Sequence, residues 1–137
     1  MKFTEKELKD NFVLFAQVVW YYLDLPPLTE VQVDVANYMA DSAKRDRMIQ
    51  AYRGAGKSYL AYVYCLWRIY KDPDIKILAI SASSSRADAF SETCQRMLNV
   101  VPFLNHLIPE GRDVTYTKKV WSVAGTKASG SHTVTSK

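Results

Sequence analysis

Cysteine and histidine are scarce in this chain of 137 residues, which contains two of each. Two cysteines do not make the dense disulfide framework of small secreted domains. Cys65 and Cys94 both lie in apolar patterns of helical period, so we expect reduced thiols in the core. No Cys-x-x-Cys pair is present, and His106 and His132 stand apart, which argues against a zinc site.

A long hydrophobic run is also missing. The longest apolar stretch, residues 12–23, has twelve residues and is interrupted by Gln17, whereas a membrane-spanning helix needs about 20. The N-terminal segment mixes charges and offers no small-residue cleavage site, unlike a signal peptide. We therefore expect an intracellular protein with no membrane partner.

Glycine and proline number only five each, while 48% of the residues are hydrophobic and 23% are charged. These values are typical of a globular domain and exclude a disordered or fibrous chain. The length predicts a single domain. Lys and Arg total 18 against 14 Asp and Glu, and the resulting net charge of +4 permits contact with nucleic acid without establishing it.

Helical patterns fill the first third of the chain. Apolar residues recur at spacings of three and four over residues 4–23, which predicts a helix. Because this helix is apolar nearly all round, we expect it in the core or covered by a partner chain. Pro26 and Pro27 should end it. A second helix is predicted to begin at Thr29, with Gln32 at the spacing of a capping box.

The middle of the chain alternates strand and helix patterns. The predicted order is a strand over residues 47–52, a glycine-rich loop, a helix over 57–71, a buried strand over 75–80 and a helix ended by Pro102. This βαβα order predicts an α/β fold: a partial, P-loop NTPase-like three-layer core with a parallel sheet, preceded by an N-terminal helical segment.

Beyond Pro109 the pattern weakens, and residues 114–117 and 120–123 are predicted to form a hairpin. The interpretation divides the chain into three segments. They are N-terminal helices with an adenine-recognition motif (1–45), a partial P-loop ATPase core (46–124) and a polar tail or loop that ends before a Walker B strand (125–137).

Residues 51–58 nearly fit the phosphate-binding pattern G-x-x-x-x-G-K-[ST], with Ala51 in place of the first glycine. Gly54 and Gly56 let the backbone curl its N–H groups toward phosphate oxygens. The loop opens a helix, whose N-terminus favours an anion. Lys57 can reach the β- and γ-phosphates, and the Ser58 hydroxyl can ligate Mg²⁺. We therefore predict that this segment binds the phosphates of a nucleotide.

Two residues near this motif have two interpretations each. Arg53 either touches the γ-phosphate or is a surface arginine on a tight turn. Gln32 either completes the capping box only, or also recognises the adenine edge through its amide, which both donates and accepts hydrogen bonds. The candidate cofactor-binding residues are Gln32, Arg53, Gly54, Ala55, Gly56, Lys57, Ser58 and Tyr59.

Residues 50–58 resemble the deviant Walker A motif of phage terminase large subunits, in particular those of short-tailed podophages, also called DNA maturase B. The likeness continues before the motif, over residues 12–39, and after it, over residues 67–104. It weakens over residues 122–131. The resemblance therefore covers roughly residues 8–131, and it is more specific than any single motif.

The resemblance implies an ATP-driven motor in the cytoplasm of the bacterial host. Members of the family pump double-stranded DNA through the portal into a procapsid, as a homo-oligomeric ring with a small terminase subunit as partner and a second, metal-dependent nuclease domain. Carried across by motif, Lys57 and Ser58 hold ATP phosphates and Mg²⁺, Arg53 is the Walker A arginine, and Gln32 faces adenine.

The chain departs from the family at its C-terminal end. The family's Walker B strand, with its metal-binding acid and catalytic glutamate, should follow shortly after Ser131, yet no carboxylate side chain occurs after Asp113. His132 stands where the family tends to place an arginine. Phosphoryl transfer needs a held metal and a positioned water. We therefore expect an N-terminal portion of the ATPase, with no complete catalytic set, negligible ATPase activity and no nuclease activity.

Two other functions stay open from the sequence. One is a portion of a different P-loop ATPase, such as a helicase-like translocase. The other is a non-catalytic remnant that acts as an interaction module, using its apolar first helix to join a partner chain.

Overall fold

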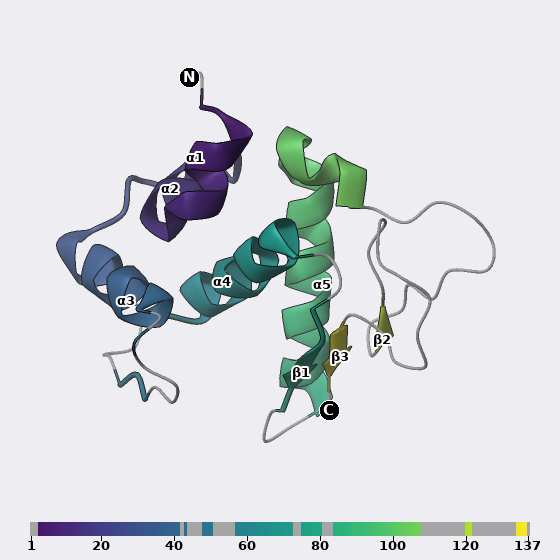
Figure 1. Cartoon of the computed structure of the whole chain (residues 1–137). Helices are drawn as coiled ribbons and strands as arrows, with labels where there is room; N and C mark the ends of the chain where they lie inside the picture. Colours follow the sequence, from purple (N-terminus) through teal and green to yellow (C-terminus); the bar gives the residue numbers. More distant parts are fainter. Residues whose placement is uncertain are drawn as a thin grey trace. The chain divides into compact units, whose positions relative to one another are not determined.

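The structure of the chain is a computed structural model. It describes residues 3–41, 43, 48–50, 57–72, 75–80, 84–107, 120–121 and 134–136. Within these residues there are five α-helices, one 3-10 helix and three short strands (Figure 1). The chain clusters into two compact units, Met1–Trp67 and Arg68–Lys137.

The single helix predicted over residues 4–23 is two helices, α1 (Glu5–Asp10) and α2 (Phe12–Tyr22). Asn11 separates them with an extended backbone, at φ −131° and ψ 102°. Its backbone N–H closes α1 by donating to the Glu7 carbonyl at 3.1 Å, and its side-chain oxygen accepts from the Leu14 N–H at 3.2 Å. An asparagine that offers its own side chain to the backbone favours such a cap over a helix interior.

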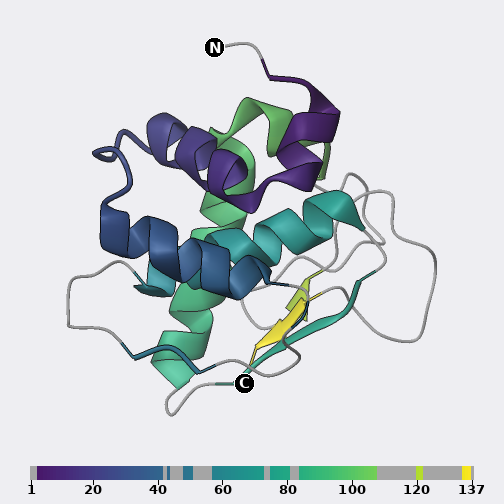
Figure 2. The ribbon, with the colours of Figure 1, turned by 60° about the vertical axis from the view of Figure 1, so that its left-hand side comes forward.

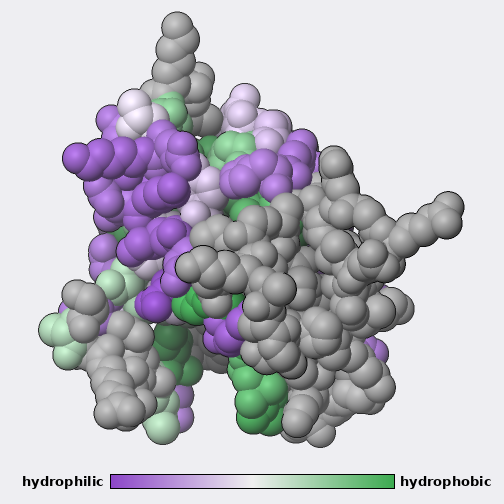
Figure 3. Space-filling model, turned by 45° about the vertical axis from the view of Figure 1, so that its right-hand side comes forward, coloured by the Kyte–Doolittle hydropathy of each residue, from purple (hydrophilic) through white to green (hydrophobic). Residues whose placement is uncertain are grey.

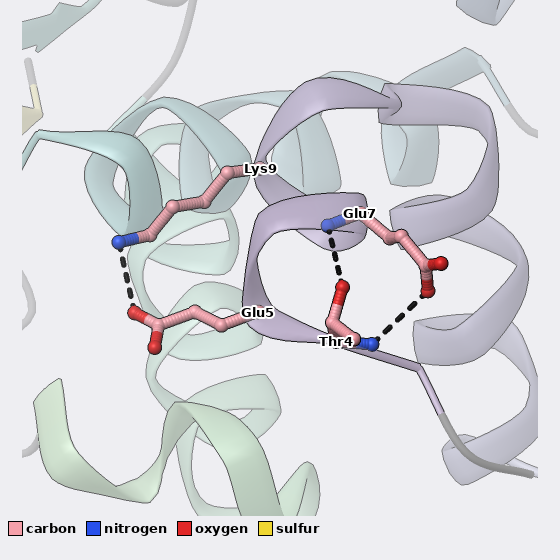
Figure 4. A network of polar contacts seen from close by, with 4 residues as sticks. All are labelled: Thr4, Glu5, Glu7 and Lys9. Carbon is pink, nitrogen blue, oxygen red and sulfur yellow. Dashed lines mark hydrogen bonds and ion pairs between the residues drawn. The ribbon is translucent and has the colours of Figure 1, made fainter.

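α1 is only six residues long and is held by side-chain contacts at its start (Figure 4). The Glu7 N–H donates to Thr4 Oγ1 at 3.2 Å, and the Thr4 N–H donates to Glu7 Oε2 at 3.0 Å, which is a complete capping box. Lys9 Nζ pairs with Glu5 Oε1 at 2.8 Å, one turn along the helix. The capping box satisfies backbone N–H groups at the start of this short helix, and the ion pair adds a side-chain contact along it.

α2 ends at Tyr22, ahead of the two prolines that the sequence pattern predicts as its end. Asp24 has a φ of 60°, and the Leu25 N–H donates to the Trp20 carbonyl at 3.1 Å. This is the arrangement of a Schellman turn, in which a left-handed residue reverses the chain and satisfies carbonyls at the helix end.

α3 (Glu30–Ala40) begins at the predicted N-cap, Thr29, and lies beside α2 (Figure 2). Apolar side chains of α1 to α4 form the core of the first unit, and most of α2 is buried in it. The interpretation of α2 as a core helix is therefore confirmed, and its buried residues are not a surface for a partner chain. The buried residues of this core are Leu8, Phe12, Phe15, Ala16, Val18, Val19, Trp20, Ala36, Met39, Leu60, Val63, Leu66 and Trp67.

An aromatic cluster ties α4 (Lys57–Lys71) to the N-terminal helices. The ring of Phe12 lies 5.4 Å from that of Tyr64 and 5.1 Å from that of Trp67, measured between centroids. The indole Nε1–H of Trp67 donates to the backbone carbonyl of Leu8 at 3.1 Å, in a buried position. This hydrogen bond joins residues 59 positions apart, so it fixes α1 on α4.

In the second unit, α5 (Ser84–Val100) and a 3-10 helix, η1 (Pro102–Leu107), follow each other and pack together. The prediction of a helix that ends before Pro102 is confirmed. Proline is tolerated in the first turn of the next helix because that turn needs no N–H from it. Tyr70 contacts the rings of Phe103 and His106, at 5.8 and 6.0 Å between centroids.

The described sheet is small and mixed. Its strands are β1 (Ile77–Ala79), β2 (Val120–Trp121) and β3 (Val134–Ser136), in the order β1-β3-β2. β1 and β3 are parallel, with Ile77 opposite Val134, whereas β2 is antiparallel to β3. Helices make up most of the described chain, and the predicted three-layer α/β core with a parallel sheet is wrong.

The strand predictions fail for identifiable reasons. Residues 48–50, within the predicted strand over 47–52, form no strand, and the Met48 N–H donates to the Tyr38 hydroxyl at 3.3 Å instead. The run predicted to be buried on both faces leaves Leu78 and Ile80 57% and 76% exposed. β2 pairs with β3, which lies in the segment interpreted as a polar tail, and residues 114–117 of the predicted hairpin lie outside the described residues.

The face drawn in Figure 3 shows both hydrophilic and hydrophobic residues on the described surface. In Figure 3, hydrophilic residues form the largest areas of the described surface, with smaller hydrophobic areas between them. Within the described ranges, no helix is both long enough and apolar enough to cross a membrane.

Candidate functional site

The predicted phosphate loop is described only from its last two residues onward. Arg53, Gly54, Ala55 and Gly56 lie outside the described residues. Lys57 begins α4, so the prediction that the motif opens a helix is confirmed. The roles predicted for the four loop residues stay predictions.

The start of α4 is the described part of the predicted phosphate site. The first N–H groups of a helix have no acceptor within it, and the aligned peptide dipoles add partial positive charge there. Ser58 is exposed in this first turn, and it lines a hollow of about 210 Å³ together with Met39, Ile49 and Ala61. The Ser58 hydroxyl is therefore accessible to a ligand at the helix N-terminus.

Tyr59, the next residue, packs against aromatic neighbours. Its ring centroid lies 6.3 Å from that of Trp20, in an edge-on contact at 77°, and 6.0 Å from that of Tyr62. Tyr59 as a whole is 38% exposed. Tyr59 thus links the start of α4 to α2, and its predicted contact with nucleotide stays a prediction.

Gln32 makes the capping contacts that its spacing predicts. Its Oε1 accepts from the Thr29 N–H at 3.0 Å, and its own N–H donates to Thr29 Oγ1 at 3.2 Å. The capping interpretation is therefore confirmed. An amide oxygen has two lone pairs, so the cap does not exclude a second hydrogen bond to a base. Recognition of adenine by Gln32 stays a prediction.

A pocket of about 430 Å³ lies where α2 gives way to the segment leading to α3. This volume is within the range of small-molecule sites, about 300–1,000 Å³. Trp20, which lines it, also contacts Tyr59 at the start of α4. Sequence reasoning missed this pocket, although three consecutive aromatics (residues 20–22) upstream of Leu-Pro-Pro-Leu are a visible cue. The lining residues are Gln17, Trp20, Tyr21, Leu25, Pro27 and Leu28.

The Cys65 thiol of α4 is not poised as a nucleophile. Neither Cys65 nor Cys94 is in a disulfide, and burial raises the pKa of Cys65 from 9.0 to about 11. The thiol, rather than the nucleophilic thiolate, therefore prevails at neutral pH. In the part of the chain that the structure describes, no three His, Cys, Asp or Glu side chains are grouped to hold a metal ion.

No protein-family model matches the sequence. The chain is 39% identical over 103 residues, or 75% of its length, to a protein named terminase, large subunit, from Enterobacteria phage T3. It spans 18% of the length of that relative.

Proposed function

Because this chain is a relative of terminase large subunits, as its motifs predicted, we propose that it is the nucleotide-binding portion of a viral DNA-packaging motor. The observation that carries the proposal is the 39% identity over 103 residues. It favours a packaging motor over a helicase-like translocase. The position of the Gly-Lys-Ser sequence, residues 56–58, also supports the proposal, because α4 begins at its lysine.

The phosphates of ATP would bind at the start of α4. The N–H groups of the first turn would receive phosphate oxygens, and the Lys57 ammonium would neutralise the β- and γ-phosphates. The exposed Ser58 hydroxyl would ligate the Mg²⁺ that ATP brings. Arg53 would add a second cation near the γ-phosphate.

The base would bind in the 430 Å³ pocket at the end of α2. Trp20 and Tyr21 offer aromatic surface to a purine, and the Gln17 amide can both donate and accept. Leu28, in the same wall, directly precedes the Thr29–Gln32 cap, so Gln32 is near enough in sequence to contribute. The contact between Trp20 and Tyr59 connects this pocket to the phosphate end.

In the whole protein, we propose that ATP hydrolysis drives double-stranded DNA through the portal into the procapsid, with a small terminase subunit as partner and a ring of subunits as the working form. The chain spans 18% of its relative, so these steps need residues beyond it. No carboxylate side chain follows Asp113 to hold a metal or activate water. The chain alone would bind ATP without measurable turnover.

Titration with Mg²⁺-ATP tests the site. Lys57→Ala removes a charge-assisted contact, which is worth about 1.5–3 kcal/mol, so we expect its Kd to rise roughly tenfold to hundredfold. Lys71→Ala removes the same charge at the other end of α4 and should bind like wild type. Absence of ATP binding by wild type, or equal binding by Lys57→Ala, would contradict the proposal.

A further inference from the structure

We propose that Tyr59 is a positioning residue of the nucleotide site, because its ring holds the wall of the base pocket at the end of α2 against the first turn of α4. The inference rests on the proposed function, and it changes the role of Tyr59 from a contact with nucleotide to a contact with the pocket wall. Tyr59 acts through Trp20, which lines the pocket.

The contact between the two residues is made by their rings. The Tyr59 centroid lies 6.3 Å from that of Trp20, edge-on at 77°, and 6.0 Å from that of Tyr62. Trp20 is almost fully buried, so its indole has a fixed place in the pocket wall. Among the residues that the structure describes, none is hydrogen-bonded to the Tyr59 hydroxyl. The ring, rather than the hydroxyl, therefore links the first turn of α4 to the pocket.

A second aromatic contact joins the same two helices away from the pocket. The ring of Phe12, at the start of α2, lies 5.1 Å from that of Trp67 and 5.4 Å from that of Tyr64. Phe12 and Trp20 are eight residues apart, or about 12 Å along a helix. Tyr59 and Trp67 are separated by the same number of residues. Two contacts so far apart fix one helix on the other, and the contact at Tyr59 is the one at the base pocket.

This placement matters because ATP would occupy two subsites at once, the base pocket and the start of α4. Once the base is bound, the triphosphate meets the start of α4 at an effective concentration that depends on the separation of the two subsites. Binding costs less when the protein already holds that separation. Loss of the contact should therefore weaken a ligand that spans both subsites and spare a ligand that fills only the start of α4.

The test is Tyr59→Leu, which removes the ring and keeps an apolar side chain that suits a helix. We expect the Kd for Mg²⁺-ATP to rise about twofold to tenfold, the range for loss of one aromatic pair. The Kd for Mg²⁺-tripolyphosphate, which has no base, should stay unchanged. Tyr59→Phe retains the ring and should restore the affinity for ATP.

Tyr64→Leu is the matched control. It removes a ring that contacts Phe12 at the other end of α2, so it should lower the thermal stability of the chain. The Kd for Mg²⁺-ATP should stay that of wild type, because the contact between Trp20 and Tyr59 remains.

Each other outcome has a definite meaning. An unchanged Kd for ATP in Tyr59→Leu, with ATP still bound by wild type, overturns this inference and leaves the proposed function standing. Equal weakening in Tyr59→Phe would show that the hydroxyl contacts the nucleotide directly, and equal weakening in Tyr64→Leu would show a purely structural role. Either result overturns the inference. If wild type binds no ATP, the proposed function fails and the inference fails with it.

Discussion

Among single residues, Asp24 has an uncommon, left-handed backbone conformation, which costs free energy at a residue with a Cβ. With φ at 60°, it is the one non-glycine residue of positive φ in the described segments. Its N–H donates to the Tyr21 carbonyl at 3.1 Å, in the turn that ends α2. The Cβ of an L-residue makes the left-handed conformation unfavourable, and glycine avoids this penalty. The sequence hides the turn, because the prolines that follow are the stronger cue for a helix end.

We predict that Asp24→Gly stabilises the chain by about 0.5–1 kcal/mol, because relief of the left-handed strain exceeds the added entropy of the unfolded chain. Urea denaturation followed by circular dichroism measures the change. Asparagine tolerates the left-handed region, so Asp24→Asn should have little effect. A glycine variant less stable than wild type would show that the Asp24 side chain makes a compensating interaction.

At the scale of elements, helices were predictable where strands were not. The starts of α3 and α4 follow from capping and loop residues close in sequence, which act within one turn. Strand β3 pairs Val134 with Ile77, far earlier in the chain, and its Val-Thr-Ser sequence carries no strong apolar pattern. Pairing between distant segments is invisible to local patterns, and this explains the error in the predicted sheet.

Substitution of Gln32, in the first turn of α3, can separate its capping role from the proposed recognition of adenine. Gln32→Glu keeps an acceptor at the capping position, where a negative charge also suits the helix N-terminus, so stability should change by less than about 0.5 kcal/mol. A carboxylate cannot donate to adenine, so we predict that the Kd for ATP rises about tenfold and that preference for ATP over GTP falls.

Gln32→Ala is the matched variant, since it removes the cap as well. It should lose stability together with ATP affinity, as measured by thermal denaturation and by titration with both nucleotides. If Gln32→Glu binds ATP and GTP as wild type does, Gln32 is a capping residue only.

For the molecule as a whole, the two parts of the candidate site differ in how well the sequence predicts them: the start of α4 was predicted, and the pocket at the end of α2 was not. The proposed phosphate end follows from consecutive residues in the sequence, and the structure places two of them, Lys57 and Ser58, at the start of α4. The pocket at the end of α2 needs Gln17 and Leu28 brought together by a chain reversal. Such a reversal depends on the Asp24 backbone and on packing between α2 and α3, which no short motif encodes.

The stability of the N-terminal helices on α4 should depend on one buried hydrogen bond. Trp67 Nε1 donates to the Leu8 carbonyl at 3.1 Å, and Trp67 is 6% exposed. Trp67→Phe keeps an aromatic ring beside Phe12 but leaves that carbonyl without its donor. An unsatisfied buried group costs about 1–3 kcal/mol, and the lost ring volume adds to this cost, so we predict at least that loss of unfolding free energy.

Trp20→Phe is the matched control for this prediction. Trp20 is 5% exposed, and its indole makes no hydrogen bond among the contacts described for the chain. The same loss of ring volume should therefore cost less there, and the difference between the two variants in chemical denaturation reports the hydrogen bond. Equal losses would mean that packing alone joins α1 to α4. A larger loss at Trp67, together with faster exchange of α1 amides, would show that the hydrogen bond keeps the start of the chain on the helix that begins with Lys57 and Ser58.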